Sequence, residues 1–158
     1  FIPGCQEKRK KNMISIRKNE LVQAVKISKK IPEFNDPYAL QEYKSRISGE
    51  SHLILTAKDN KKKVGFKIGY DRFHDGSFYS WMGGVLPKFR RMGVAYSLAN
   101  FQEKWAVENG FSSILLKTRQ KHDEMIAFSF NRGFIITEET QITPAEETRI
   151  WMGKSLNR

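Results

Sequence analysis

The sequence contains one cysteine, three histidines and no long apolar run. The single cysteine, Cys5, cannot form a disulfide within the chain and excludes a zinc module built on several cysteines. The histidines, His52, His74 and His122, lie far apart without helical metal-binding spacing, so no metal site is expected. No apolar stretch approaches the roughly 18 residues that span a bilayer, so no membrane partner is expected. The cysteine usage favours a cytoplasmic location.

Positive charge is abundant. The 28 Lys and Arg residues exceed the 17 Asp and Glu residues, which gives a net charge of +11. Such a surplus favours anionic partners, which include nucleic acid and phosphorylated small molecules. The basic residues are mostly scattered, so nucleic-acid binding is not expected to be the main function. Residues 1–12 lack hydrophobic periodicity and are expected to be a flexible basic tail or a cloning remnant, before a single domain at 13–158.

The apolar pattern predicts a meander of strands followed by strand–helix–strand units. Strands are predicted at residues 13–16, 52–57, 64–70, 77–85, 113–118, 134–137 and 148–152, and helices around residues 21–27, 38–47, 93–109 and 123–131. Asp36 is expected to cap the second helix, and Met125, Ile126 and Phe128 to point inward from the last. This order implies an α/β (α+β mixed) fold, in which about four helices pack on a mixed, mostly antiparallel sheet.

Residues 81–98 (WMGGVLPKFRRMGVAYSL) run from a strand through a basic turn into a helix. The free N–H groups and positive dipole end of such a helix form an anion site that suits a pyrophosphate. Gly93 would let the backbone approach the phosphates, and Arg90 and Arg91 add charge at the rim. The alternative is a plain strand–helix connection with a solvated arginine pair.

Gly83 and Gly84 end the strand before this turn and predict a β-bulge or a close backbone approach. A bulge would push the strand from its neighbour and leave backbone groups near Val85 for an amide-bearing ligand. Coenzyme A combines such an amide-bearing arm with a pyrophosphate. The alternative is packing under a bulky residue such as Trp105.

Residues 89–95 (FRRMGVA), after Val85-Leu86-Pro87, resemble the acetyl-CoA signature of the GNAT N-acetyltransferase superfamily. Residues 125–134 (MIAFSFNRGF) resemble its second segment, and the likeness covers essentially 13–156. It implies a V-splayed sheet with acetyl-CoA, the acyl-donor substrate, between the strands predicted at 77–85 and 113–118. The cofactor-binding residues that it implies are Val85 and Leu86 at the pantetheine arm, Arg90, Arg91, Met92, Gly93, Val94 and Ala95 at the pyrophosphate, and Gln120 in place of a family asparagine.

The sequence departs from the family at the catalytic positions. Ser129 stands where many members have a tyrosine that protonates the CoA thiolate, and Tyr79 stands where many have a glutamate base. Tyr96 is either a second acid candidate or packs beneath the cofactor. Tyr79, Trp81 and Gly83 are expected to share one face, which lines the acceptor pocket or the core. His74 with Asp75 is a proton acceptor or, more simply, a surface pair.

The expected activity is direct transfer of an acetyl group to an amine of a small molecule or protein in a ternary complex. A neutral or acidic acceptor is favoured, because a basic enzyme repels polycations. The alternatives are a catalytically weak acyl-CoA-binding module, a basic nucleic-acid-binding protein and a structural dimer without ligand. A homodimer is compatible with each of these functions.

Overall fold

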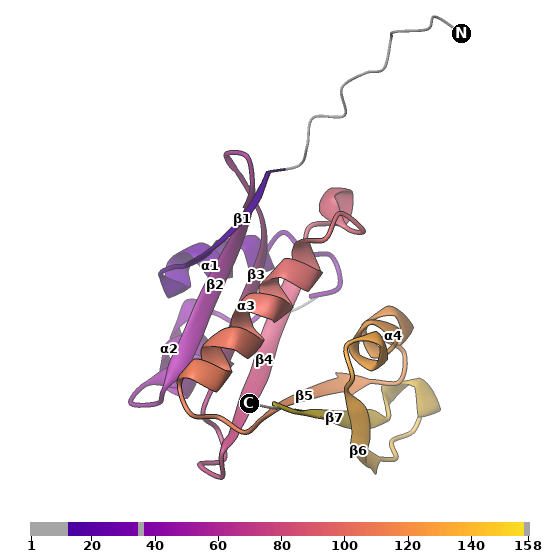
Figure 1. The fold of residues 1–158 in the computed structure, drawn as a ribbon. Helices are drawn as coiled ribbons and strands as arrows, with labels where there is room; N and C mark the ends of the chain where they lie inside the picture. Colours follow the sequence, from indigo (N-terminus) through magenta and orange to yellow (C-terminus); the bar gives the residue numbers. More distant parts are fainter. Residues whose placement is uncertain (1–12, 35–36, 157–158) are drawn as a thin grey trace, which may run out of the picture.

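The computed structural model describes residues 13–34 and 37–156, which form one seven-stranded sheet (Figure 1). Its neighbours run in the order β1-β2-β3-β4-β5-β7-β6, and only the β4–β5 pair is parallel. The strands are β1 (Ile14–Lys18), β2 (His52–Asp59), β3 (Lys62–Tyr70), β4 (Ser77–Val85), β5 (Ser113–Arg119), β6 (Ile135–Thr140) and β7 (Arg149–Ser155). The prediction of a mixed, mostly antiparallel sheet is confirmed.

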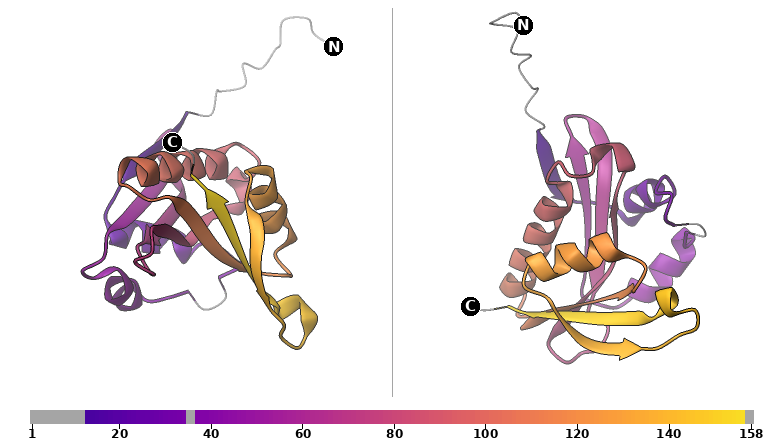
Figure 2. Two further views of the ribbon diagram at one scale, coloured as in Figure 1. Left: turned by 60° about the horizontal axis from the view of Figure 1, so that its bottom comes forward. Right: turned by 90° about the vertical axis from the view of Figure 1, so that its right-hand side faces the viewer.

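The helices cover both faces of this sheet (Figure 2). They are α1 (Leu21–Ser28), α2 (Leu40–Ile47), α3 (Val94–Glu108) and α4 (Asp123–Asn131). The face under α1 and α2 carries one apolar cluster, centred on Tyr43, Phe66 and Ile68. The face under α3 carries the other, which includes Phe78 and Ile114. Within the described ranges, no helix combines the length and apolar composition needed to cross a membrane.

The strands β4 and β5 pair at only three positions, although both continue well beyond them. The pairs are Ser77 with Ser113, Phe78 with Ile114 and Tyr79 with Leu115. Past Tyr79, β4 and β5 no longer pair with each other. There β4 pairs only with β3, and β5 pairs only with β7. The sheet therefore divides into two arms that open as a V, an N-terminal arm of β1 to β4 and a C-terminal arm of β5 to β7.

A β-bulge lies where the two strands separate. Ile68 pairs with Met82 and Gly69 with Ser80, so Trp81 is an extra residue in β4. A bulge bends its strand and increases the local twist, which explains why β4 leaves β5 here. Of the two alternatives predicted for Gly83 and Gly84, a bulge at the glycines is wrong, because they continue the regular ladder and the bulge lies at Trp81.

The bulge also changes which residues share a face of β4. Tyr79 and Trp81 both belong to the cluster under α1 and α2, whereas a Cβ on Gly83 would point toward Lys67 on the other side. The expectation that all three line one face is therefore wrong. Gly84 is the residue that faces α1, where a Cβ would lie 2.5 Å from Ile31 Cδ1, so this glycine allows the segment after α1 to pack closely.

Most predicted elements agree with the structure to within a few residues. In α4, Ile126 and Phe128 are partly buried as expected, but Met125 is 42% exposed and the inward prediction is wrong for it. Ser129 is the buried residue of that helix, because the helix is rotated relative to the face that the apolar pattern suggested. The predictions for the tail at 1–12, including Cys5, and for the Asp36 cap lie outside the described residues.

Candidate active site

The turn between β4 and α3 presents backbone N–H groups with no acceptor. From Arg91 to Tyr96, no N–H donates to a group in the described part of the chain, and the first helical bond runs from Ser97 N to Gly93 O at 3.0 Å. The turn reaches this shape because Arg91 and Gly93 have positive φ values of 62° and 85°. Six free donors at the positive end of a helix of 15 residues form a site for an anion.

The two arginines of the turn differ in their surroundings. Arg90 Nε donates to Val85 O at 3.1 Å, and its Nη2 pairs with Glu33 in the segment after α1. Arg90 therefore braces the turn against the end of β4. Arg91 is 90% exposed and reaches only Glu124, at 3.8 Å, at the start of α4. Of the two, Arg91 is the one free to approach a bound anion.

Past Tyr79, one edge of β4 faces β5 across the opening of the V, which we call the gap. This edge carries free backbone groups. Leu86 N donates to Val64 O at 2.8 Å, which makes Leu86 and Val64 a hydrogen-bonded pair with β3. Because such pairs alternate, the backbone groups of Val85 and Gly83 point away from β3 and toward the gap. The prediction that Leu86 pairs with the pantetheine arm is therefore wrong for its N–H. The N–H groups of Val85 and Gly83 are the ones that do not bond to β3, and Gly83 was not among the predicted cofactor-binding residues.

The profile described as the acetyltransferase (GNAT) family matches residues 19–134, most of the chain. The chain belongs to the GNAT acetyltransferase family. An acetyltransferase from Pectobacterium atrosepticum is 32% identical to it over 93 residues. That match covers 59% of this chain and 63% of the relative's length.

Solved structures share the fold of this GNAT chain. The ribosomal-protein-S18-alanine N-acetyltransferase from Escherichia coli matches with a TM-score of 0.78 at 21% identity, over 92% of this chain and 96% of that one. The protein yncA from Salmonella typhimurium, solved with its cofactor acetyl-CoA, matches with a TM-score of 0.71 at 16% identity, over 93% and 96%. These likenesses confirm the predicted GNAT fold.

Two predicted site residues lie in or near α4, Ser129 within the second GNAT segment and Gln120 ahead of it. Ser129, at the family's tyrosine position, is 2% exposed, and its Oγ donates to Met125 O at 2.8 Å within α4. That hydroxyl is thus engaged by its own helix rather than directed at a ligand. Gln120 is exposed in the loop before α4, and its backbone N donates to Thr148 O at 2.9 Å. Its side chain has no hydrogen-bond partner in the described ranges.

Tyr96 lies in the first turn of α3, at the anion site. It is 57% exposed, and the Arg132 guanidinium lies 5.1 Å from its ring centroid. Arg132, at the end of α4, also pairs with Glu103 on α3. Tyr96 is therefore placed to contact the phosphate end of a ligand in this turn, rather than the far end of the gap.

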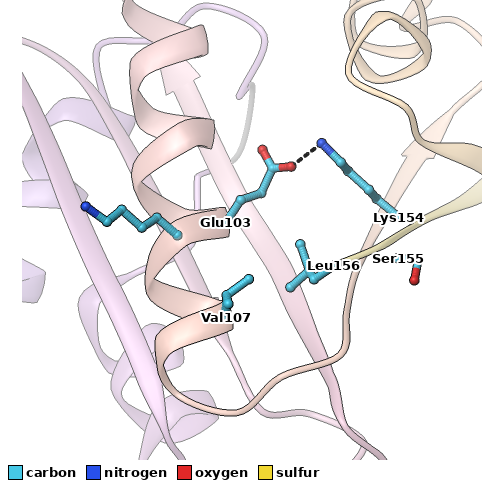
Figure 3. Close-up of a pocket in the computed structure, with 6 residues that line it drawn as sticks. Glu103, Val107, Lys154, Ser155 and Leu156 are labelled. Carbon is cyan, nitrogen blue, oxygen red and sulfur yellow. Dashed lines mark ion pairs between the residues drawn. The ribbon is translucent and has the colours of Figure 1, made fainter. Parts of the chain in front are cut away.

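Glu103 joins the two arms of the sheet (Figure 3). Its carboxylate pairs with Arg132 at the end of α4 and with Lys154 on β7, and its side chain is only 13% exposed. A cavity of about 310 Å³ lies beside this group and is lined partly by Val107 and Leu156. The cavity contains no residue of the signature turn, so it is separate from the candidate site.

Lys67 is a candidate site residue that the sequence analysis did not name. Its side chain projects from β3 beside the gap-facing segment of β4, and a Cβ on Gly83 would lie 3.7 Å from its Nζ. Burial and the positive charge of Arg132 lower the pKa of Lys67 to about 8, against the opposing effect of Glu103. The available signal was a lone lysine inside an otherwise apolar strand, VGFKIGY.

Tyr79 lies on the opposite face of the sheet, at the last β4–β5 pair. It is 2% exposed, and burial raises the pKa of its phenol. The Arg72 guanidinium lies 5.0 Å from its ring centroid. Tyr79 thus remains protonated at neutral pH and cannot replace the family's glutamate as a base.

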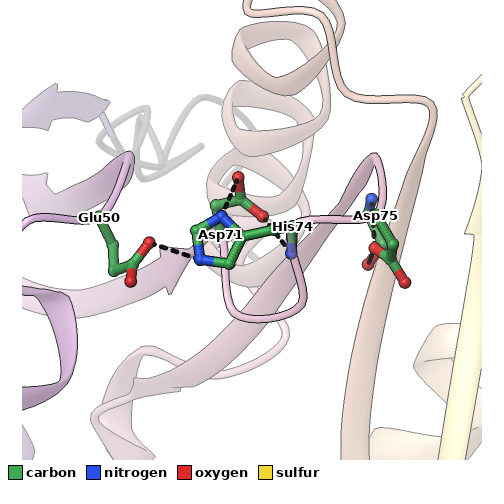
Figure 4. Close-up of polar contacts among 5 residues, drawn as sticks. Glu50, Asp71, His74 and Asp75 are labelled. Carbon is green, nitrogen blue, oxygen red and sulfur yellow. Dashed lines mark hydrogen bonds and ion pairs between the residues drawn. The ribbon is translucent and has the colours of Figure 1, made fainter.

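Two of the three histidines, His74 and His52, contact Glu50. His74 Nε2 lies 3.0 Å from Glu50 Oε2, and its Nδ1 lies 3.5 Å from Asp71 Oδ2 (Figure 4). Asp75 instead accepts from Ser77, so the suggested His74–Asp75 pair does not form. His52 Nδ1 contacts Glu50 O at 2.9 Å. Among the described residues, no three His, Cys, Asp or Glu side chains are grouped to hold a metal ion.

Proposed function

We propose that this GNAT protein is an N-acetyltransferase that transfers an acetyl group from acetyl-CoA to an amine by direct attack in a ternary complex. The observation that carries this proposal is the continuity of two sets of free backbone groups. The N–H groups from Arg91 to Tyr96 open α3, and the N–H of Val85 and the gap-facing groups of Gly83 precede them along the chain. A pyrophosphate followed by an amide-bearing arm matches both sets in that order.

The chain's own residues position the donor. The amides of Arg91, Met92, Gly93, Val94 and Ala95 bind the pyrophosphate, with Arg91 as the free cation at the rim. The N–H of Val85 pairs with the pantetheine arm as a neighbouring strand would, while its carbonyl stays with Arg90. The arm then continues past Gly83 toward the bulge. The thioester is thereby held where the two arms of the sheet separate.

Acetyl transfer in this arrangement rests on proximity and backbone electrostatics. The neutral amine attacks the thioester carbonyl, and the gap-facing N–H of Gly83 stabilises the oxyanion that develops. The Lys67 ammonium lies beside Gly83, and with a pKa of about 8 it is mostly charged at neutral pH. It provides the proton or positive charge for the departing thiolate. Ser129 has no role in proton transfer in this scheme, because its hydroxyl is bonded to Met125 O.

The alternative is a GNAT module that binds acyl-CoA without turnover. It is favoured by the absence of an Asp or Glu side chain on β4 that could act as a base. Calorimetric titration with acetyl-CoA, together with release of free CoA across a panel of amines, tests both. Binding with turnover supports the enzyme, and binding without turnover supports the module. No binding of acetyl-CoA contradicts both.

The remaining proposals concern assembly and location. A homodimer is supported by β6, an edge strand on which Ile135 and Ile136 are 65% and 39% exposed. Sedimentation equilibrium tests it, and a monomer at all concentrations contradicts it. A cytoplasmic location rests on the single cysteine in the chain.

A further inference from the structure

The face of the V opposite α3 carries a group of aromatic rings at the point where β4 and β5 separate. Tyr79 lies 5.7 Å from Trp151 and 6.2 Å from Phe73, measured between ring centroids. Tyr70 links this group to Trp81, at 5.8 Å from Tyr79 and 5.5 Å from Trp81. The rings come from β3, β4, β7 and the β3–β4 loop, so they line both arms beside the opening.

Three cations lie over these rings. The Arg72 guanidinium is 5.1 Å from the Phe73 ring centroid and 5.8 Å from that of Trp151, and Lys117 Nζ is 5.5 Å from Trp151. The Arg46 guanidinium is 5.2 Å from the Trp81 ring. These contacts keep the charged groups over the rings, where Lys117 is also exposed to solvent. We refer to Arg46, Arg72 and Lys117, with the rings beneath them, as the cationic face.

The cations of the cationic face have few ion-pair partners. Arg46 pairs with Glu42 at 3.4 Å, whereas neither Arg72 nor Lys117 forms an ion pair within the described ranges. The nearby carboxylates are engaged elsewhere, Asp71 and Glu50 by His74, and Glu147 by Arg119 and Lys121. Glu138, on the edge strand β6, pairs in register with Trp151 and forms no ion pair within the described ranges.

The mutual repulsion of these cations is visible at Lys117. Burial lowers the pKa of its ammonium, and the positive charges of Arg72, Arg149, Arg46 and Arg119 lower it further. When an anion binds among like charges this close, it relieves their repulsion and lowers the free energy of the folded chain.

The two faces of the V have different roles under the proposed function, on which this inference rests. The donor enters from the α3 side, where its phosphates meet the free N–H groups. A second substrate that attacks the same thioester therefore approaches from the other face. We propose that the acceptor is a primary amine that also bears an anionic group, a carboxylate or a phosphate, which Arg72 and Lys117 bind while the amine points into the opening.

Matched acceptors test this assignment. Phenylalanine is compared with phenylalaninamide, and phosphoethanolamine with ethanolamine, in wild type, Arg72→Gln and Lys117→Gln. Because each acceptor keeps its own amine pKa across the variants, the ratio of wild-type to variant kcat/KM isolates the effect of the cation. We expect each variant to lose at least tenfold more with an anionic acceptor than with its neutral partner. The pair that responds distinguishes a carboxylate from a phosphate.

Two controls keep the test decisive. Lys104→Gln removes one positive charge from the exposed surface of α3, on the opposite face, and should leave every ratio unchanged. Acceptor binding to the protein saturated with CoA, measured by calorimetry, provides a readout that does not require turnover. Equal losses for anionic and neutral acceptors, or no binding of either anionic acceptor, overturn the inference. If the wild-type protein does not bind acetyl-CoA, the proposed function itself is refuted.

Discussion

The guanidinium of Arg72 lies 5.0 Å from the centroid of the Tyr79 ring, at the last residue pair that joins β4 to β5. The positive charge of Arg72 lowers the pKa of the phenol, but burial raises it more strongly, so the net shift is upward. Tyr79 is therefore a neutral side chain at the junction of the two arms. Under the proposed function, Tyr79 shapes the acceptor side and does not accept a proton.

The first prediction concerns the origin of the pH dependence. Without a base on β4, kcat/KM should rise with pH at a slope near one until the acceptor amine's own pKa. Tyr79→Phe should leave this limb in place, because the phenol does not ionise in that range. Profiles measured with two amines of different pKa check this. A limb that stays at one pH for both amines, and that Tyr79→Phe removes, would show that the phenol is the base.

The second prediction concerns Gly93. In Gly93→Glu, a negative side chain enters the pyrophosphate site, and the affinity for acetyl-CoA should fall at least tenfold, about 1.4 kcal/mol. Gly110→Glu is the matched control, because both glycines have φ near 85° and neither Cβ would meet another atom within 4 Å. Both variants thus carry the same backbone strain, and only the first should lose affinity. Equal affinities by calorimetry would contradict the binding site.

The third prediction concerns Lys67. Lys67→Met removes a desolvated charge beside Arg132 and should stabilise the fold by about 1 kcal/mol at pH 7, while lowering kcat. The gain should be full below pH 8 and should fade toward pH 10.5, because between these values the unfolded lysine binds a proton that the folded one has lost. Thermal melting against pH and steady-state kinetics measure the two effects. A variant with unchanged kcat would remove Lys67 from the mechanism.

The fourth prediction concerns Glu103, which pairs with Arg132 and Lys154 across the arms. Glu103→Gln leaves two partly buried cations without their counter-charge and should lower the free energy of unfolding by about 3 kcal/mol. Urea denaturation gives the value. Glu108→Gln, at the exposed end of the same helix, is the control and should change stability by less than about 0.5 kcal/mol. Similar values for the two variants would mean that the ion pairs do not hold the arms together.

The fifth prediction concerns Ser129. Its hydroxyl donates to Met125 O and is buried, so Ser129→Ala should cost about 1 kcal/mol of stability and leave kcat nearly unchanged. Parallel measurement of the melting temperature and of kcat separates the two roles. A large fall in kcat with no loss of stability would restore the serine as a catalytic group.

The sequence predicted the elements well because their signals are local. The helical spacing of Val94, Leu98 and Trp105 and the stop at Gly110 placed α3 to within a residue at each end. The glycine of the signature turn was likewise readable, since a positive φ such as that of Gly93 favours a residue without a Cβ.

The site's finer geometry could not be read in this way, because it depends on pairings between distant segments. Arg90 reaches Glu33, which is 57 residues away, so its bracing role leaves no local signature. The bulge at Trp81 appears only in the register between β3 and β4. The hydroxyl of Ser129 has a local partner, but only the rotation of α4 decides that it turns inward.

Because only three residue pairs join β4 to β5, the stability of the folded protein should also depend on the concentration of the donor around it. Under the proposed function, the donor lies along the free edge of β4 like an additional strand, so it binds the folded chain and not the unfolded one. A ligand present at about 100 times its dissociation constant adds about 2.7 kcal/mol to folding stability. Chains in a medium rich in acetyl-CoA should therefore resist proteolysis longer than chains deprived of it, and the supply of donor sets the protein's lifetime as well as its rate.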